Sequence, residues 1–269
     1  MQPYSVLMTV YKDDNPDYFE LSLKSMLGQT LVPDEIILVK DGPITKELQN
    51  VIDSLNNGII KEISLPKNVG LGLALNEGIK NISNELIARM DSDDYSMPER
   101  CELQVKEFEK NPKLDIIGCP VREFVGSIGN IVGERKVPLT NEEIYNFSKK
   151  RDPFNHPTVM YRKSAVEAAG CYSDYRKNQD TDLWIKMLSN GVTCMNLADP
   201  VFLFRFDKST YQKRKSWLNT KILIEIRYKA WKSGFNSFAD FLMVTAAQLT
   251  IYLLPLTFQK LLYQKILRR

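Results

Sequence analysis

Three aspartates, Asp91, Asp93 and Asp94, lie within four positions directly after the apolar run ELIARM at residues 85–90. On an extended chain, Asp91 and Asp93 point to the same side and Asp94 points elsewhere. Two carboxylates that point together repel each other unless a cation joins them, and Mg²⁺ and Mn²⁺ prefer oxygen ligands of this kind. An ion bound by one or two carboxylates completes its shell with water and substrate phosphates. The stretch therefore predicts a divalent-metal site that receives a phosphate-bearing ligand.

A surface turn that caps the following helix is the alternative interpretation of this stretch. The sequence SMPE at residues 96–99 has the pattern of a capping box, with Pro98 in the first helical turn. Because Ser96 would supply that cap, Asp91 and Asp93 would remain available to a metal ion.

Short aliphatic and β-branched runs alternate with helical patterns over the first hundred residues. The runs typical of strands cover residues 5–11, 35–39, 59–65 and 85–90. The helical patterns cover residues 18–27, 48–55 and 70–82. This alternation predicts an α/β fold with a mainly parallel sheet and helices on both faces. Ligands bind such sheets beyond the carboxyl ends of the strands, where the aspartates would lie.

Composition narrows the class of protein. The 269 residues are 43% hydrophobic, which is enough for one large core and a smaller appendage. Lys and Arg exceed Asp and Glu by 36 to 33, so the charge does not indicate a nucleic-acid partner. No C-x-x-C pair and no leader-like N-terminus is present, and we expect a cytoplasmic setting with small, buried cysteines.

Seven segments, in this order and spacing, resemble the family 2 inverting glycosyltransferases with the GT-A fold. They are SVLMTVY, EIILVKDGP, KNVGLGLALNEGI, IARMDSDD, PER, NHPTVMYRKS and QDTDLW, and they run from about residue 5 to 205. The resemblance is strongest to bacterial members that build O-antigen, capsule and exopolysaccharide repeat units. It implies a Rossmann-like GT-A catalytic domain over residues 1–207.

The resemblance also implies a nucleotide site at the ends of the first strands. Thr9 and Tyr11 match the loop that holds the nucleobase, and Asp41 matches the acid that accepts a hydrogen bond from uracil. Asp91 matches the ribose contact and Asp93 the metal ligand. Taken alone, DGP at residues 41–43 is also compatible with an ordinary turn. The glycines of NVGLGLALNEG, taken alone, are compatible with close packing of the chain. The nucleotide side is completed by Asn68, Gly70 and Asn76.

The segment NQDTDLWIKMLSNG predicts a helix that begins near Asp180 and ends by Asn190. Family members commonly carry Glu-Asp at this start, with the Asp as general base, and this chain has Gln179 and Asp180. The missing first acid puts an acceptor contact in doubt. Asp180 is therefore the expected catalytic base, one carboxylate being sufficient for inversion. The alternatives are that Asp180 only caps the helix and that Asp182 is the base.

His156 is the only histidine, and it is either structural or a contact to metal or diphosphate. Many relatives place a metal-binding histidine after the last strand. At the matching place, FLFRFDKST, this chain has Arg205 and Asp207. Asp207 is thus a further candidate metal ligand, and Arg205 a candidate phosphate contact.

Residues 208–269 differ from the rest of the chain. Basic and aromatic residues alternate from 208 to 232, and residues 241–259 carry no charge but include Pro255. We expect amphipathic helices that lie in a membrane interface, where each cation adds roughly 1 kcal/mol of attraction to anionic lipid. The alternative is a helical bundle that packs on the catalytic domain or forms a homodimer.

These observations together predict an enzyme that uses Mn²⁺ or Mg²⁺ to transfer a hexose, galactose or next glucose, from a UDP-sugar. The expected acceptor is a sugar on undecaprenyl diphosphate, the product linkage is β, and the protein lies at the cytoplasmic face of the bacterial inner membrane. The alternatives are a sugar nucleotidyltransferase and a non-catalytic membrane scaffold. The first would need a glycine-rich, basic phosphate loop after the first strand, which the sequence lacks.

Overall fold

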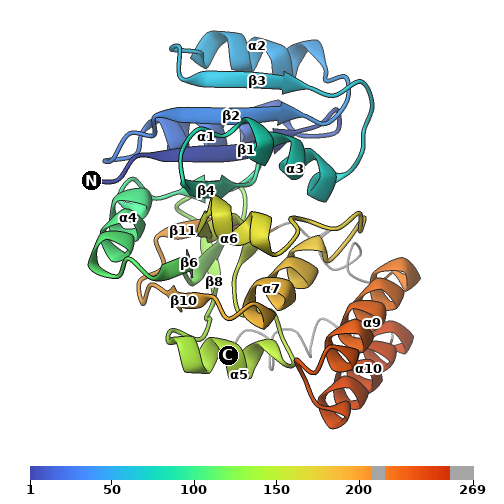
Figure 1. The fold of residues 1–269 in the computed structure, drawn as a ribbon. Coiled ribbons are helices and arrows are strands. Elements are labelled where there is room, and N and C mark those ends of the chain that lie inside the picture. Colours follow the sequence, from blue (N-terminus) through green and yellow to red (C-terminus); the bar gives the residue numbers. More distant parts are fainter. Residues whose placement is uncertain (207–215, 255–269) are drawn as a thin grey trace.

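A seven-stranded sheet forms the centre of the protein in the computed structural model, which describes residues 1–206 and 216–254 (Figure 1). The strand order is β10-β6-β9-β4-β1-β2-β3, and β9 alone in this sheet runs antiparallel to its neighbours. The mainly parallel sheet predicted from the sequence is therefore confirmed. The strands are β1 (Tyr4–Val10), β2 (Glu35–Lys40), β3 (Ile60–Ser64), β4 (Leu86–Met90), β6 (Leu114–Gly118), β9 (Met160–Arg162) and β10 (Thr193–Asn196).

Helices cover both faces of this sheet, as the alternating pattern predicted. On β1, Val6 and Met8 pack in one core cluster with helices α1, α2 and α4, and Leu7 packs in the other with α3, α5, α6 and α7. The helices are α1 (Pro16–Leu27), α2 (Lys46–Leu55), α3 (Leu71–Asn81), α4 (Arg100–Lys110), α5 (Asn141–Ser148), α6 (Lys163–Ala168) and α7 (Gln179–Ser189), with a 3₁₀ turn η1 (His156–Thr158).

A second, four-stranded sheet has the order β5-β11-β7-β8. Its strand β5 is antiparallel to β11 and brings Tyr95 opposite Leu203, which are far apart in the sequence. The turn that carries the three aspartates therefore lies at the junction of the two sheets. The strands are β5 (Tyr95–Ser96), β7 (Val121–Phe124), β8 (Ile131–Arg135) and β11 (Phe202–Arg205).

The capping-box prediction for residues 96–99 is wrong. Ser96 lies in β5, and α4 begins only at Arg100, after the N-cap residue Glu99, which makes no side-chain cap hydrogen bond. The hydroxyl of Ser96 instead accepts a hydrogen bond from Gln29 Nε2 at 3.1 Å. Pairing of β5 with β11 keeps this stretch extended, so a long-range contact overrides the local signal.

Two C-terminal helices, α9 (Trp217–Lys232) and α10 (Phe238–Leu253), pack on each other beside α7 (Figure 1). Three side chains of α9, Ile222, Ile226 and Ala230, form a small core with Ile185 of α7. Within residues 1–206 and 216–254, no helix combines the length and the apolar character needed to cross a membrane. The division into a catalytic domain and a tail at residues 207 and 208 stays a prediction.

The expected burial of the cysteines is found at three positions. Cys101, Cys119 and Cys194 are buried, whereas Cys171 is half-buried. None of the four forms a disulfide.

Candidate active site

The three aspartates form one cluster at the carboxyl end of β4. One carboxylate oxygen from each of Asp91, Asp93 and Asp94 lies within 4.8 Å of the others. The chain bends at residues 92 and 93 instead of continuing as an extended strand. The expectation that Asp94 points elsewhere is therefore wrong, because the bend turns its side chain into the cluster.

Asp94 is fully buried and incompletely paired. Its Oδ1 accepts a hydrogen bond from the Arg205 backbone N–H at 2.7 Å, and its Oδ2 has no partner among the residues that the structure describes. Burial raises the pKa of Asp94 well above its usual range, and Asp93 and Asp91 raise it further. A buried carboxylate without a partner is costly, so this atom requires a proton or a cation.

Arg89 supplies the nearest positive charge. Its side chain is fully buried within β4, and its Nη1 forms an ion pair with Asp91 Oδ1. Arg89 thus offsets part of the repulsion between the aspartates.

Arg205 holds the aspartate turn in place. Its Nε donates to the Asp93 carbonyl oxygen at 2.7 Å and its Nη1 to the Gly126 carbonyl oxygen at 3.0 Å. The guanidinium also lies over the Tyr18 ring, 3.7 Å from its centre. Arg205 therefore connects the aspartate turn to the second sheet. Its predicted contact with phosphate stays a prediction.

Asp41 follows β2 and accepts hydrogen bonds from the residues at the start of α3. Its Oδ1 accepts from the Val69 N–H at 2.7 Å, and its Oδ2 accepts from the Gly70 N–H at 3.0 Å and from Asn68 Nδ2 at 2.9 Å. Asp41 is 6% exposed, so these bonds are largely shielded from water. Three of the residues predicted for the nucleotide side, Asp41, Asn68 and Gly70, are thus in direct contact.

Gly42 allows this close approach, and replacing it should destabilise the fold. Its φ is +88°, and an added Cβ would lie 2.7 Å from the Asn68 backbone nitrogen. We expect Gly42→Ala to cost about 2 kcal/mol, which lowers Tm by about 5 °C. Gly58 is the matched control, because its φ is +96° but an added Cβ meets nothing within 4 Å. Thermal melts in which Gly58→Ala lowers Tm as much as Gly42→Ala would remove the steric explanation.

Thr9 and Tyr11 lie at the carboxyl end of β1, between the aspartate cluster and Asp41. Thr9 pairs with Val39 of β2, and Tyr11 follows the strand with 40% of its surface exposed. Because β4, β1 and β2 are parallel neighbours, their ends form one edge of the sheet. Thr9, Tyr11 and Asp41 therefore lie at the same edge of the sheet as the predicted metal ligands.

Asp14 is an acid at this edge that the sequence interpretation missed. Its Oδ2 accepts from the Tyr11 N–H at 3.1 Å. Burial raises the pKa of Asp14 to about 6, and Asp93 and Asp91 contribute to the increase. The sequence feature that could have indicated Asp14 is its position in YKDDNPD, the loop directly after the first strand.

Asn76 has a different environment from the other nucleotide candidates. Its Nδ2 donates to the Tyr172 carbonyl oxygen at 2.8 Å, and its Oδ1 accepts from the Tyr172 N–H at 3.0 Å. The amide thus joins α3 to the loop before α7, and a nucleotide contact by Asn76 stays a prediction.

Asp180 lies at the second position of α7, where it is half-buried. Burial raises the pKa of Asp180 to about 7, Asp152 adds to the increase, and Arg89 opposes it. The residue at the N-cap is Asn178, so Asp180 is not the cap residue. A carboxylate with a pKa near neutrality is suited to accept a proton at physiological pH.

Asp182, the alternative base, is committed to other partners. Its Oδ2 lies 2.6 Å from Lys186 Nζ and accepts a hydrogen bond from Ser173 Oγ. The ion pair and the hydrogen bond fix the orientation of the Asp182 carboxylate. Asp182 is thus held in an ion pair with Lys186, whereas burial raises the pKa of Asp180.

His156 packs against aromatic side chains. It is 8% exposed, its Nε2 is 3.0 Å from the Tyr172 hydroxyl, and its ring packs against Trp184. Burial and the charge of Arg89 lower the pKa of His156 well below its usual value, so the ring is neutral. Among the described residues, His156 is not part of the group that can hold a metal. Asp207, the further candidate metal ligand, lies outside the described residues.

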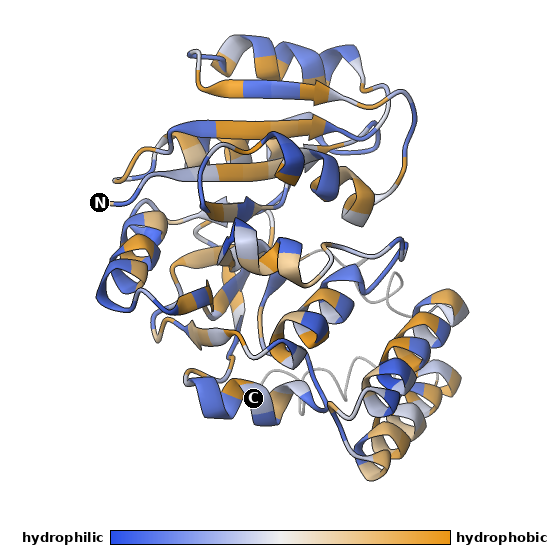
Figure 2. Ribbon diagram, viewed as in Figure 1, coloured by the Kyte–Doolittle hydropathy of each residue, from blue (hydrophilic) through white to orange (hydrophobic). Residues whose placement is uncertain are grey.

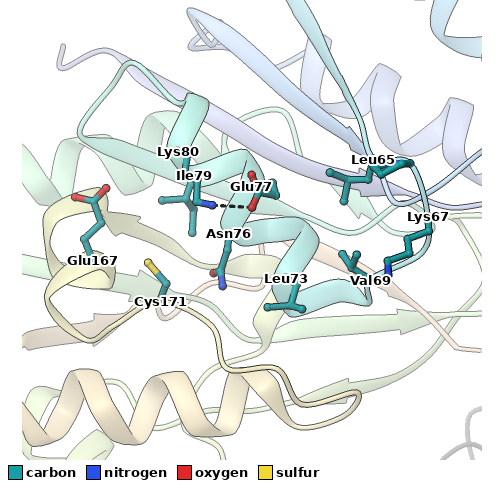
Figure 3. Close-up of a pocket in the computed structure, with 11 residues that line it drawn as sticks. Leu65, Lys67, Val69, Leu73, Asn76, Glu77, Ile79, Lys80, Glu167 and Cys171 are labelled. Atoms are coloured by element: carbon teal, nitrogen blue, oxygen red, sulfur yellow. Dashed lines mark hydrogen bonds and ion pairs between the residues drawn. The ribbon is translucent and has the colours of Figure 1, made fainter.

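A cleft of about 400 Å³ lies beside α3 (Figure 3). Its wall is mainly apolar, with Leu65, Val69, Leu73 and Ile79 among its residues, and none of the three aspartates lines it. The lining also includes Asn76, a candidate nucleotide residue, and the cations Lys67 and Lys80.

Comparison with known proteins identifies the chain. The family described as Glycosyl transferase family 2 matches this chain over residues 5–170. The chain belongs to this family. An Escherichia coli protein named UDP-Gal:alpha-D-GlcNAc-diphosphoundecaprenol beta-1,3-galactosyltransferase is 35% identical over 267 residues, which are 99% of this chain and 97% of that protein. The Erwinia amylovora amylovoran biosynthesis glycosyltransferase AmsE is 33% identical, over 97% of this chain and 98% of that protein.

Solved structures show the same fold as this family 2 glycosyltransferase. Residues 1–349 of S. aureus TarS, in complex with UDP-GlcNAc, superimpose with a TM-score of 0.68 at 18% identity, covering 92% of this chain and 71% of TarS 1–349. The mannosyltransferase PcManGT from Pyrobaculum calidifontis, in complex with GDP-Man and Mn²⁺, gives 0.64 at 15% identity, covering 92% and 69%. The fold of this family 2 chain is therefore GT-A, as the resemblance implied.

The acids of this glycosyltransferase fit a hard divalent cation. The cluster offers three carboxylate oxygens within 4.8 Å, and Asp94 Oδ2 has no protein partner in the described part of the chain. Oxygen-only ligands of this number match Mg²⁺ or Mn²⁺ better than they match zinc.

Proposed function

We propose that this glycosyltransferase transfers galactose from UDP-galactose to a sugar carried on undecaprenyl diphosphate, with inversion to a β linkage. The observation that carries the proposal is the placement of Asp41, Asp91, Asp93 and Asp94 at one sheet edge, with Asp180 at the start of α7. The donor and the lipid-linked acceptor are supported by the E. coli relative, whose name includes both.

The nucleotide side of the proposal uses the edge formed by β4, β1 and β2. Asp41 would accept a hydrogen bond from the uracil N–H with a remaining lone pair, and Asp91 would contact the ribose. Asp93 and Asp94, with Asp91, would hold Mn²⁺ or Mg²⁺, which neutralises the charge that develops on the departing diphosphate.

Asp180 is the proposed general base. As the acceptor hydroxyl oxygen attacks the anomeric carbon, its proton passes to the Asp180 carboxylate, and the bond to the diphosphate breaks with its electron pair leaving on UDP. A single displacement of this kind inverts an α-linked donor to a β product. The raised pKa of Asp180, about 7, supports this role because the group can both ionise and accept a proton near neutral pH.

The decisive experiment incubates the purified chain with Mn²⁺, a panel of UDP-sugars and a synthetic N-acetylglucosamine-diphospholipid. We expect transfer from UDP-galactose, loss of transfer with EDTA, and a β anomeric proton in the NMR spectrum of the product. An α product, or no transfer from any UDP-sugar, would contradict the proposal. Release of pyrophosphate from a nucleoside triphosphate would indicate a nucleotidyltransferase instead.

Helices α9 and α10 support a membrane surface as the place of action. They expose several large apolar side chains, and Figure 2 shows hydrophobic residues along both helices. A contiguous exposed apolar surface is uncommon on a monomeric protein and marks a binding surface. The exposed apolar residues are Trp217, Leu218, Tyr228, Phe238, Leu242, Met243, Leu249 and Leu253.

A charge placed on this surface should weaken binding to lipid vesicles. We expect Leu242→Asp together with Met243→Asp to lower the fraction bound to anionic vesicles by about tenfold, because two inserted apolar side chains are lost. Sedimentation with vesicles measures the bound fraction. Val32→Asp is the control, since Val32 is 59% exposed but lies outside the two helices. Full vesicle binding by the double variant, together with a wild-type dimer in light scattering that the double variant loses, would favour the homodimer interface.

A further inference from the structure

The bend that carries the aspartates is held by two hydrogen bonds to its backbone. On one side, Ser22 Oγ of α1 donates to the Asp91 carbonyl oxygen at 2.5 Å. On the other side, Arg205 Nε of β11 donates to the Asp93 carbonyl oxygen at 2.7 Å. Because the three carboxylates of the cluster lie within 4.8 Å of one another, their repulsion favours a more open turn. The two hydrogen bonds therefore oppose that opening.

The side chain of Arg205 is itself held in a fixed orientation. It is 7% exposed, and its guanidinium carbon lies 3.7 Å from the centre of the Tyr18 ring and 4.5 Å from the centre of the Phe124 ring. Its Nη1 donates to the Gly126 carbonyl oxygen, in the connection between β7 and β8, at 3.0 Å. A planar guanidinium that stacks on aromatic rings and forms two directed hydrogen bonds cannot be replaced by the single ammonium group of lysine. The Nε–H group thus has a defined direction toward the turn.

The main chain of Arg205 contacts a second acid of the cluster. Its backbone N–H donates to Asp94 Oδ1 at 2.7 Å, and Asp94 Oδ2 has no partner in residues 1–206 and 216–254. Arg205 therefore contacts two successive acids, Asp93 through its side chain and Asp94 through its main chain.

We propose that Arg205 is a positioning residue for the metal site, because it holds the aspartate turn in the geometry that binds a divalent ion, and that the Tyr18 ring keeps its guanidinium in place. This inference rests on the proposed function and deepens it. Arg205 acts through Asp93 and Asp94 and does not itself bind the ion. Loss of an outer hydrogen-bond partner of this kind costs about tenfold to a hundredfold in metal affinity.

The sign of the change in affinity separates positioning from a simple effect of charge. A guanidinium near the acids repels a divalent cation, so Arg205→Met would tighten Mn²⁺ binding if charge alone mattered. Positioning predicts the opposite, a Kd for Mn²⁺ that rises about tenfold. Arg205→Lys keeps the positive charge but cannot form both side-chain hydrogen bonds, so its Kd should also rise.

The measurement is a titration of the full-length protein with Mn²⁺ alone, in which electron paramagnetic resonance detects the free hydrated ion. Thermal melts of each variant report the accompanying change in Tm. An unchanged or lower Kd in Arg205→Met would overturn the inference, and so would a wild type that binds no Mn²⁺.

Arg162→Met is the matched control. Arg162 donates from Nε to the Leu114 carbonyl oxygen at 2.8 Å and from Nη2 to the Pro112 carbonyl oxygen at 3.0 Å, and its guanidinium lies over the Phe108 ring. It pairs with Leu86 at the start of β4, whereas the aspartates follow the end of that strand. We expect Arg162→Met to lower Tm with no change in the Kd for Mn²⁺. An equal rise in Kd for this control would also overturn the inference.

Tyr18 provides a second test that does not depend on how well Arg205→Met folds. Its side chain is 38% exposed, so a substitution there should be tolerated by the fold. Tyr18→Leu removes the ring that stacks on Arg205 and should raise the Kd for Mn²⁺, whereas Tyr18→Phe keeps the ring and should keep the Kd. Equal Kd values for Tyr18→Leu and the wild type would contradict the proposed role of the stack.

A titration with UDP in the presence of EDTA distinguishes positioning from a direct contact with phosphate. We expect the same UDP affinity for the wild type and for Arg205→Met, and a loss in the variant would assign Arg205 to the phosphate instead. The Mn²⁺ titration uses no sugar donor. Weaker Mn²⁺ binding by Arg205→Met therefore supports the inference even if every UDP-sugar fails as a donor, and equal binding overturns it even if galactose transfer is observed.

Discussion

Asp93→Ala should abolish transfer, with a loss of about a thousandfold or more in kcat/KM. The cluster would lose one of three carboxylates that lie within 4.8 Å of one another, and with it the charge needed to hold a divalent ion. Stabilisation of a departing diphosphate by a metal is worth several kcal/mol, and about 4 kcal/mol corresponds to a factor of roughly a thousand.

Calorimetry and turnover together test this prediction. Titration with Mn²⁺ in the presence of UDP should give clear binding for the wild type and weak or absent binding for Asp93→Ala. Asp199→Ala is the control, because Asp199 is an exposed acid in a turn before β11. Near-normal turnover by Asp93→Ala would remove the metal assignment.

Asp180→Asn should stop the reaction while leaving UDP binding intact. A general base contributes about a hundredfold to ten-thousandfold, and the amide of asparagine cannot accept the proton of the acceptor hydroxyl. In the wild type the base must be ionised, so kcat should fall about tenfold per unit as the pH decreases below about 7.

The raised pKa of Asp180 also predicts how stability depends on pH. As pH rises toward about 7, kcat should increase but the fold should become less stable. Because the folded protein binds the Asp180 proton more tightly than the unfolded chain does, ionisation of Asp180 destabilises the fold as pH rises toward about 7. Asp180→Asn removes that ionisation, so its Tm at pH 8 should equal or exceed that of the wild type. Thermal melts and UDP titrations check both points, and a variant that retains full turnover would place the base elsewhere.

Asp182→Asn is the matched control on the same helix. Asp182 is bound to Lys186 and Ser173, so its loss should lower Tm without moving the acid limb of the pH–rate profile. Loss of that limb in Asp182→Asn, but not in Asp180→Asn, would exchange the assignments of the two acids.

Local sequence patterns were sufficient to predict four of the seven strands of the central sheet, β1 to β4. The observed β1, β2, β3 and β4 begin and end within one residue of the predicted runs, and α3 begins at Leu71, one residue after the expected start. Strands β1, β2 and β4 are buried almost throughout, so they appear in the sequence as nearly continuous aliphatic and β-branched runs.

The details of the aspartate cluster depended on contacts between distant parts of the chain. Asp94 turns inward because Arg205 donates its backbone N–H to it, and β5 forms because it pairs with β11. Nothing in the residues around position 94 encodes a partner that lies 111 positions later. The same reason explains why the Ser96 cap was wrongly predicted.

The candidate site was only partly accessible to sequence reasoning. Asp180 could be selected from the start of a helical pattern, but its difference from Asp182 depends on burial, on Asp152 and on Lys186. The ion pair between Arg227 and Asp152 joins α9 to the segment after α5, which lies far earlier in the sequence. Pairings of this kind become visible only in three dimensions.

The bonds of Asp41 have a consequence for how this enzyme can diversify. One carboxylate holds the first turn of α3 through Asn68, Val69 and Gly70, and the same carboxylate is the proposed partner of the nucleobase. A single replacement of Asp41 would alter the nucleobase preference and also remove the hydrogen bonds that hold the start of α3. A change of nucleotide preference would thus need compensating substitutions at residues 68–70. A change of acceptor preference would not require substitutions there.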